Sequence, residues 1–315
     1  MDDMSQRTFG VRRITRNRLA GAMLATCRGL RDMFFTVSDK SVVTGTFTSD
    51  AVAVARLLAG HAFPVSAVDS AADLGVDSSG GRVLAARPIE RKRHAKGRTT
   101  ATRCRTLGAA SRLHFLAGKL MRVAGVPRHA YGHEIYGTAP KPLAKLRADI
   151  ASTAACSTSG RRTSTLIAIA GDSPDPGIRF PCDTVAMYLR YWIAHPDMRM
   201  LVVRAWRAAF WWIAATPTKK RWSIQAGPLT GVINTLLDAK WVPFEANHWD
   251  CAPTYVNGVR APWAWKWPLE GGIDISGLLR DLSASLELSI WKKAALFRYG
   301  SGLEGGVDMA SLRAP

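Results

Sequence analysis

The stretch Phe34-Phe35-Thr36-Val37-Ser38-Asp39-Lys40-Ser41-Val42-Val43-Thr44-Gly45-Thr46 decides the fold class. Its two ends, 34–37 and 41–46, are rich in the β-branched and aromatic residues that strands favour. The polar run Ser38-Asp39-Lys40 between them is typical of a turn. We therefore predict an antiparallel hairpin in which these two short strands pair across the turn.

Helical patterns flank this hairpin on both sides. The proline-free segment 11–32 repeats apolar residues at helical spacing, namely Leu19, Met23, Cys27 and Leu30. Downstream, we predict a short helix over 49–59, a strand over 65–68, and then the block Asp73-Leu74-Gly75-Val76-Asp77. The first part of the chain therefore mixes helices with short strands.

The chain opens with Met1-Asp2-Asp3-Met4. An acidic pair is by itself more often a solvated turn than a site, but two further blocks follow it in order. They are Phe35-Thr-Val-Ser-Asp-Lys-Ser41 and Leu74-Gly75-Val76. This series resembles the palm of non-LTR (LINE-type) retroelement reverse transcriptases, with the chain starting inside the Tyr-x-Asp-Asp motif. The series departs from the family pattern in two places. The aromatic residue expected before Met1 is absent, and Asp73 occupies a position where the family usually has an aromatic residue.

The resemblance implies roles for these residues in RNA-directed DNA synthesis. Asp2 and Asp3 would be the catalytic metal ligands for Mg²⁺, which helps an in-line displacement in a two-metal arrangement. Lys40 would contact the departing pyrophosphate or supply a proton, the alternative being a solvated turn lysine. Leu74, Gly75 and Val76 would form the primer grip. The family also needs an Asp on an earlier strand and the fingers, so we expect an incomplete site and a missing upstream polymerase fragment.

The charge of the chain points to a nucleic-acid partner. It holds 43 Lys and Arg against 24 Asp and Glu, giving a formal charge of +19 and a pI near 10.4. Such a field attracts polyanions. The region 82–128 contains Glu90 as its only acid. We predict that its basic residues bind nucleic acid: Arg91, Lys92, Arg93, Lys96, Arg98, Arg103, Arg105, Arg112, Lys119 and Arg122.

The same basic region reads as one or two helices over 90–123, which the glycines Gly97, Gly108 and Gly118 would weaken. An apolar stripe in its second half argues for a folded segment: Leu107, Leu113, Leu116, Leu120 and Val123. The region resembles the thumb of the same family, which lies along an RNA–DNA or DNA duplex. The segment 125–137, with its Gly-x-Pro and Tyr-Gly pairs, and a helix over 141–155 continue that likeness.

Metal-binding and stacking patterns are weaker in the rest of the chain. His129 and His133 are four residues apart, a zinc-compatible spacing on a helix. A third ligand is not evident, and packing or phosphate contact is the favoured interpretation. Beyond Cys156 we predict helices over 184–195, 198–215, 229–239 and 276–297. All 11 Trp lie between Trp192 and Trp291, and Trp263, Trp265 and Trp267 alternate as on one face of a strand. A Trp-rich core is favoured, and stacking on unpaired bases is the alternative.

These patterns combine into an α+β, helix-rich chain with three parts. We predict a truncated palm over 1–80, a basic helical thumb over 81–156 and a Trp-rich region over 157–315. Five scattered cysteines and a polar N-terminus predict an intracellular protein of the nucleus or cytoplasm, without signal peptide or membrane span. The expected function is that of a reverse-transcriptase fragment that binds primer–template, without complete catalysis alone. The alternatives are a non-catalytic basic nucleic-acid-binding protein and a decayed reading frame.

Overall fold

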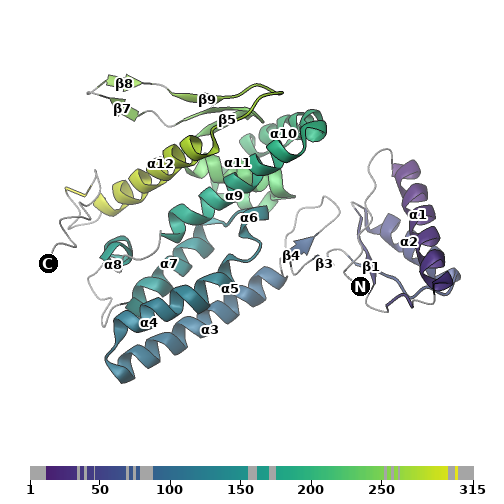
Figure 1. The fold of residues 1–315 in the computed structure, drawn as a ribbon, viewed down its shortest axis with the longest axis horizontal. Coiled ribbons are helices and arrows are strands. Elements are labelled where there is room, and N and C mark those ends of the chain that lie inside the picture. The colour runs from purple at the N-terminus through teal and green to yellow at the C-terminus, as the bar shows by residue number, and fades with distance from the viewer. Residues whose placement is uncertain are drawn as a thin grey trace. The chain divides into compact units, whose positions relative to one another are not determined.

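A computed structural model describes residues 12–33, 36–38, 41–45, 47–68, 71–73, 76–78, 88–154, 162–169, 175–251, 254–256, 259–261, 263–296 and 302–303. These residues form many helices and a few small sheets, so the α+β, helix-rich class is confirmed (Figure 1). The chain divides into two compact units, Met1–Ile89 and Glu90–Pro315. None of the described helices combines the length and apolar character needed to cross a membrane.

The first unit contains two helices and two small sheets among its described residues. In chain order the elements are α1 (Arg12–Asp32), β1 (Val42–Val43), α2 (Thr48–Gly60), β2 (Ser66–Ala67), β3 (Ala71–Asp73) and β4 (Val76–Ser78). The helices predicted over 11–32 and 49–59 are confirmed by α1 and α2, and the strand predicted over 65–68 by β2. Strands β3 and β4 pair antiparallel, with Asp73 opposite Val76.

The pairing predicted for β1 is wrong. Instead of an upstream partner, β1 pairs with β2 in parallel, with Val42 opposite Ser66 and Val43 opposite Ala67. Thr36 and Val37 lie in no strand, while Phe34 and Phe35 lie outside the described residues. The physical reason is the helix α2 between the two strands, because a crossover helix returns the chain in the same direction and makes parallel pairing possible.

The core of the first unit lies between α1, α2 and the β1–β2 pair. Cys27 of α1 and Leu58 of α2 are buried together with Val43 of β1, and Leu19 and Met23 pack against them. Arg31 ties the helix ends together: its Nη2 donates to the carbonyl of His61 at 3.1 Å and its guanidinium lies 4.3 Å from the Phe63 ring centroid. The apolar face predicted for α1 is therefore the face that packs.

The second unit begins with a helical layer built around the basic region. Its elements are α3 (Pro88–Ser111), α4 (His114–Leu120), the π-helical turn η1 (Met121–Gly125), α5 (Val126–Ala130), α6 (His133–Tyr136), α7 (Pro140–Ala154) and α8 (Thr163–Ile169). The helices predicted over 90–123 and 141–155 are confirmed by α3, α4 and α7. Their shared core contains Ala101, Cys104, Met121, Leu146 and Ile150.

The apolar stripe that indicated a folded segment faces away from the core. All five of its residues are exposed, and Val123 is the most exposed at 75%. Small or flexible residues face inward instead, including Ala101, Ala117 and Met121. The reason is spacing, because helices that pack as closely as α3 and α4 leave no room between them for branched leucine side chains.

The rest of the second unit is a helical group with a three-stranded sheet. Its helices are α9 (Pro176–Ala194), η2 (Pro196–Met198), α10 (Arg199–Ala214), η3 (Thr218–Ile224), α11 (Pro228–Asp238) and α12 (Ile275–Ala295). The sheet has the order β5 (Val242–Glu245), β6 (His248–Asp250) and β9 (Ala264–Lys266), all antiparallel. A separate hairpin pairs β7 (Thr254–Val256) with β8 (Val259–Ala261). The four helices predicted here are confirmed.

Tryptophans form the centre of this part, as the sequence predicted. Trp192, Trp206, Trp241 and Trp249 are almost fully buried, with Trp267 close behind. Trp206 and Trp249 stack with ring centroids 6.0 Å apart, and Trp206 donates its Nε1 hydrogen to the Pro243 carbonyl at 2.9 Å. Trp206 thus combines burial with a satisfied N–H, as expected of a core tryptophan. Trp211, by contrast, is 70% exposed.

Candidate nucleic-acid interface

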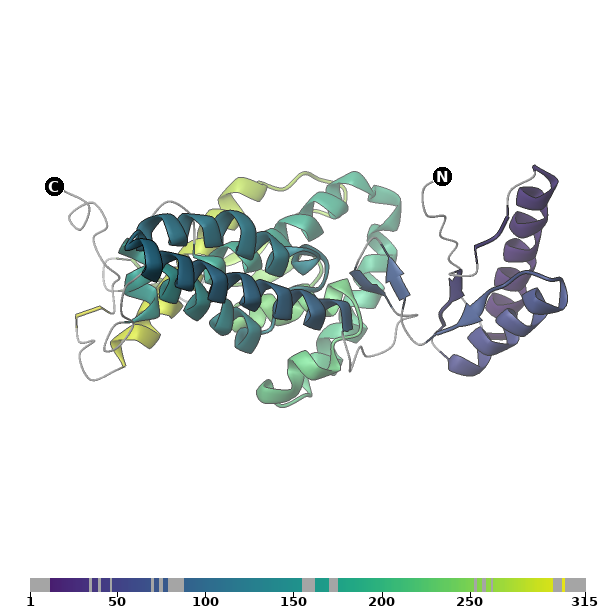
Figure 2. The same cartoon turned by 90° about the horizontal axis from the view of Figure 1, so that it is seen from below.

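Helix α3 carries most of the predicted nucleic-acid-binding residues and lies at the surface of its unit (Figures 1 and 2). It has 24 residues, which corresponds to a length of about 36 Å at 1.5 Å per residue. Its inward face consists of Gly97, Thr100, Ala101, Cys104 and Gly108, all buried. The remaining sides are exposed over most of the helix. Helix α3 therefore packs against its unit along one narrow face only.

Two glycines set how closely α3 packs. A Cβ added at Gly97 would meet the imidazole ring of His129. A Cβ added at Gly108 would lie 2.9 Å from the Cβ of Ala117 in α4. These glycines were predicted to weaken the helix through their conformational freedom. In the structure, each stands where a neighbouring element comes too near for any side chain.

His129 fills the space over Gly97. The side chain is buried, and its Nε2 has no hydrogen-bond partner among the described residues. Its ring centroid lies 5.2 Å from that of His94 on α3. Burial, helped by the positive charge of His94 and Arg98, lowers the pKa of His129 to about 4. The ring is therefore a neutral packing element at neutral pH.

The exposed side of α3 carries two rows of basic residues. Successive residues are turned by 100°, so positions seven apart return to nearly the same direction. One row contains Arg91, Arg98 and Arg105, and the other contains Lys92, Lys96 and Arg103; all six are exposed. The outermost strip between the rows holds small side chains only: Ala95, Thr99, Thr102 and Thr106. Thr99 and Thr106 turn their hydroxyls back to donate to carbonyls of their own helix.

The other predicted binding residues have different surroundings. Arg93 is half-buried; it donates to the Tyr131 carbonyl at 3.0 Å and its guanidinium lies 3.9 Å from the Tyr131 ring centroid. Arg112 is exposed and has a positive φ of 59° at the break between α3 and α4. Lys119 is exposed on α4 and Arg122 is half-buried in η1. Arg93 thus anchors α3 to the segment after α5, while Arg112 and Lys119 extend the basic surface.

A half-buried carboxylate lies within electrostatic reach of one row. Asp149 of α7 has an Oδ2 atom without a hydrogen-bond partner in the described parts of the chain. Burial raises its pKa, and the charges of Arg105, Arg98 and Lys145 act in the opposite direction. The negative charge of Asp149 therefore partly offsets the positive charges of Arg98 and Arg105.

Most residues assigned to catalysis fall outside what the structure describes. Asp2, Asp3, Lys40, Leu74 and Gly75 are among these, and Val76 is the first residue of β4. The metal, pyrophosphate and primer-grip roles of these residues stay predictions. So does the division into palm, thumb and Trp-rich region.

His129 and His133 do not share a helix. His129 belongs to α5 and His133 to α6, with Gly132 at a φ of 83° between them. His133 lies near Glu134 and Asp183, the metal-compatible group found among the described residues. However, its Nε2 is 3.0 Å from Asp183 Oδ2 and its Nδ1 contacts the Ala130 carbonyl. Both ring nitrogens face acceptors and Arg179 also pairs with Asp183, so the contacts indicate a packing role.

Sequence reasoning listed the basic residues of α3 but missed their separation into two rows. The signal was present in the spacing, because Arg91, Arg98, Arg105 and Arg112 follow one another at intervals of seven. It also missed the cations and the carboxylate that surround a cavity between α7 and α12, since these come from distant segments. Comparison with known proteins found no matching family model, no matching curated protein and no matching solved structure.

Proposed function

We propose that the chain binds double-stranded nucleic acid through the outer side of α3, by contacts to phosphate and without reading sequence. The observation that carries this proposal is the pair of basic rows on either side of a strip of small residues. Alanine and threonine between the rows would let the helix axis come close to a groove. The arginine and lysine side chains would then reach the phosphates on both sides of it.

The dimensions of α3 suit such a ligand. About 36 Å of helix matches roughly one turn of a B-form duplex, which is 34–36 Å. Phosphate contacts fix position and orientation but carry no sequence information. The threonine hydroxyls that would face the bases are already bonded to the helix itself at Thr99 and Thr106. Because these hydroxyls already donate to backbone carbonyls, we expect binding that does not depend on the base sequence.

The resemblance to reverse transcriptases supplies a specific candidate ligand, the RNA–DNA or DNA primer–template duplex. In that proposal, α3 and α4 act as the thumb, and Asp2, Asp3 and Lys40 belong to a Mg²⁺-dependent site that other polymerase parts would complete. The alternative is a basic protein that binds nucleic acid without catalysis. A decayed reading frame is the remaining alternative.

Salt-dependent binding tests the proposal. Fluorescence anisotropy would measure the affinity for two DNA duplexes of unrelated sequence and for an RNA–DNA hybrid, from 50 to 300 mM salt. We expect the two DNA affinities to agree within about threefold and the log–log salt slope to be negative, at about 0.9 per phosphate contact. Replacing Lys92, Lys96 and Arg103 by Gln should flatten the slope by about two to three.

A matched variant controls for net charge. Arg190, Arg204 and Lys220 are exposed basic residues of the same unit that lie away from α3 in α9, α10 and η3. Replacing these three by Gln removes the same charge, and we expect it to change the slope by less than about one. Equal slopes for the two triple variants would show that duplex binding does not use this row of α3.

A further inference from the structure

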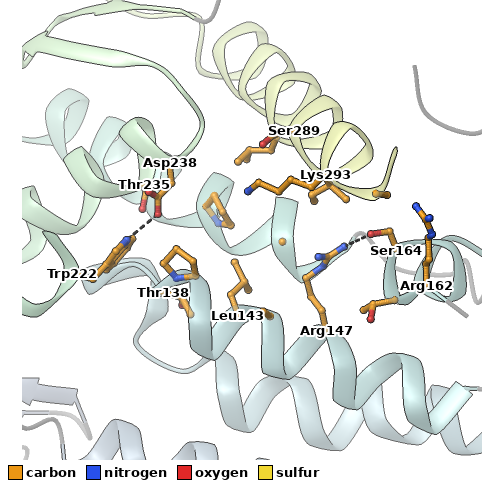
Figure 3. A pocket seen from close by; sticks show the side chains of 18 residues that line it. Thr138, Leu143, Arg147, Arg162, Ser164, Trp222, Thr235, Asp238, Ser289 and Lys293 are labelled. Atoms are coloured by element: carbon orange, nitrogen blue, oxygen red, sulfur yellow. Dashed lines mark hydrogen bonds between the residues drawn. The ribbon is translucent and has the colours of Figure 1, made fainter. Parts of the chain in front are cut away.

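Five helices of the second unit converge on a cavity of about 690 Å³ (Figure 3). They are α7, α8, α9, α11 and α12, and Trp222 of η3 adds a wall. Apolar side chains line the middle, including Leu143, Pro181, Leu286 and Ile290. Cavities of 300–1,000 Å³ with mostly apolar walls and a few fixed polar groups are the usual form of small-molecule sites. None of the lining residues belongs to α3, so this inference is independent of nucleic-acid binding.

One polar group on the cavity wall is held in a fixed position. Arg147 of α7 donates its Nε hydrogen to Asp175, 2.8 Å from Oδ1, and its Nη2 donates to Asp175 Oδ2 at 2.8 Å and to Ser164 Oγ at 3.0 Å. Asp175 is itself fixed, because it also accepts from the backbone N–H of Gly177 at the start of α9. These bonds use three of the five guanidinium hydrogens. The two on Nη1 remain, with no acceptor found in the described residues.

Two more basic side chains line the cavity. Arg162 lines it beside Ser164, and Lys293 extends into it from α12 (Figure 3). Lys293 forms no ion pair with any residue that the structure describes. Its charge acts on Asp238 and lowers the pKa of that carboxyl, against the effect of burial. A ligand carboxylate that enters between α7 and α12 would therefore share this ammonium group with Asp238.

The cavity has one carboxylate, which is already engaged. Asp238 of α11 accepts from Arg221 Nη2 at 3.0 Å and from Trp222 Nε1 at 2.9 Å. It lies on the side of the cavity away from Arg147 and Arg162 (Figure 3). A ligand with one negative charge can stay near the arginines, whereas a polyanion that filled the cavity would meet this carboxylate. The walls thus favour a monoanion with an apolar body.

We propose that this cavity binds an organic carboxylate whose apolar body packs among Leu143, Leu286 and Ile290. Its carboxylate accepts from the Nη1 hydrogens of Arg147 and from Lys293. A guanidinium held by a second carboxylate is already oriented, so it binds an anion without losing further side-chain freedom. Trp222 offers a flat wall that suits an aromatic body.

Isothermal titration calorimetry with 2-naphthoate tests this site on the full chain. We expect saturable binding of one equivalent, and binding of the neutral 2-naphthamide to be at least about tenfold weaker. Lys293→Met keeps the apolar stem and should weaken 2-naphthoate about tenfold while leaving 2-naphthamide unchanged. Lys292→Met is the matched control, because Lys292 is an exposed neighbour that does not line the cavity, and it should have no effect.

Three results would overturn the proposal. They are the absence of saturable 2-naphthoate binding up to millimolar concentration, equal affinity for the acid and the amide, and equal losses in the two lysine variants. Far-ultraviolet circular dichroism of both variants confirms that they fold. The nucleic-acid affinity of Lys293→Met should match that of Lys292→Met, which separates this site from the proposed function of α3.

Discussion

Acid should destabilise the second unit through His129, and the size of the effect follows from its surroundings. The ring is buried over Gly97, and burial, His94 and Arg98 hold its pKa at about 4, against 6.5 for an ordinary histidine. Between these two values the unfolded chain binds a proton that the folded chain excludes. The stabilisation is thus complete above about pH 6.5 and is lost as the pH falls towards 4. From pH 7 to pH 5 the loss amounts to about 2 kcal/mol.

Urea unfolding followed by tryptophan fluorescence measures this loss, because all 11 Trp lie in the second unit. Asp149 titrates with the opposite sign: burial raises its pKa, so its contribution falls as the pH rises. The informative quantity is therefore the difference between the wild type and His129→Met, which keeps bulk but cannot titrate. We expect the free energy of unfolding of the variant to fall by about 2 kcal/mol less than that of the wild type between pH 7 and pH 5. Identical pH dependence in the two proteins would show that His129 does not cause the loss.

The remaining predictions concern packing, backbone strain and catalysis. Gly97→Ala should lower the free energy of unfolding by about 1–3 kcal/mol, because the added Cβ meets the His129 ring. Gly21→Ala, in open space on α1, should raise it by up to about 1 kcal/mol. If urea unfolding gave changes of the same sign for both variants, close packing at Gly97 would not be the cause. Arg112→Gly should raise the free energy of unfolding by about 0.5–1 kcal/mol, since a positive φ suits glycine. A melting temperature of the variant below that of the wild type would contradict this. We also expect no primer extension on an RNA template with Mg²⁺, because two metal ions need more carboxylates than Asp2 and Asp3; extension abolished by Asp2→Ala would show otherwise.

Local patterns predicted the helices well because their signals are short-range. The apolar spacing of Leu19, Met23 and Cys27 is contained in α1, and the same face packs in the core. Similarly, the alternation of Trp263, Trp265 and Trp267 is reproduced around β9, where the exposed Ala264 and Lys266 lie between them. Each of these features depends on residues within one element.

Features that depend on distant partners were not predictable in the same way. Strand β1 has the composition of a hairpin arm, yet its partner β2 lies beyond α2, and composition does not distinguish the two choices. The apolar stripe that includes Leu116 and Val123 indicated a folded segment, but the residues that the close helix packing buries are Ala117 and Met121. The cavity combines Arg147, Asp238 and Lys293 from three helices, and their meeting cannot be read from spacing.

We propose above that a duplex lies on the outer side of α3, between its two basic rows. Site-specific photo-cross-linking tests it most directly, with the photoreactive amino acid p-benzoylphenylalanine placed at Thr106, between the rows, or at Ala205, an exposed position on α10. We expect a labelled 20-base-pair duplex to cross-link at position 106 and not at 205, and we expect the product to disappear when the salt is raised from 50 to 300 mM. Cross-linking at 205 with none at 106 would contradict it.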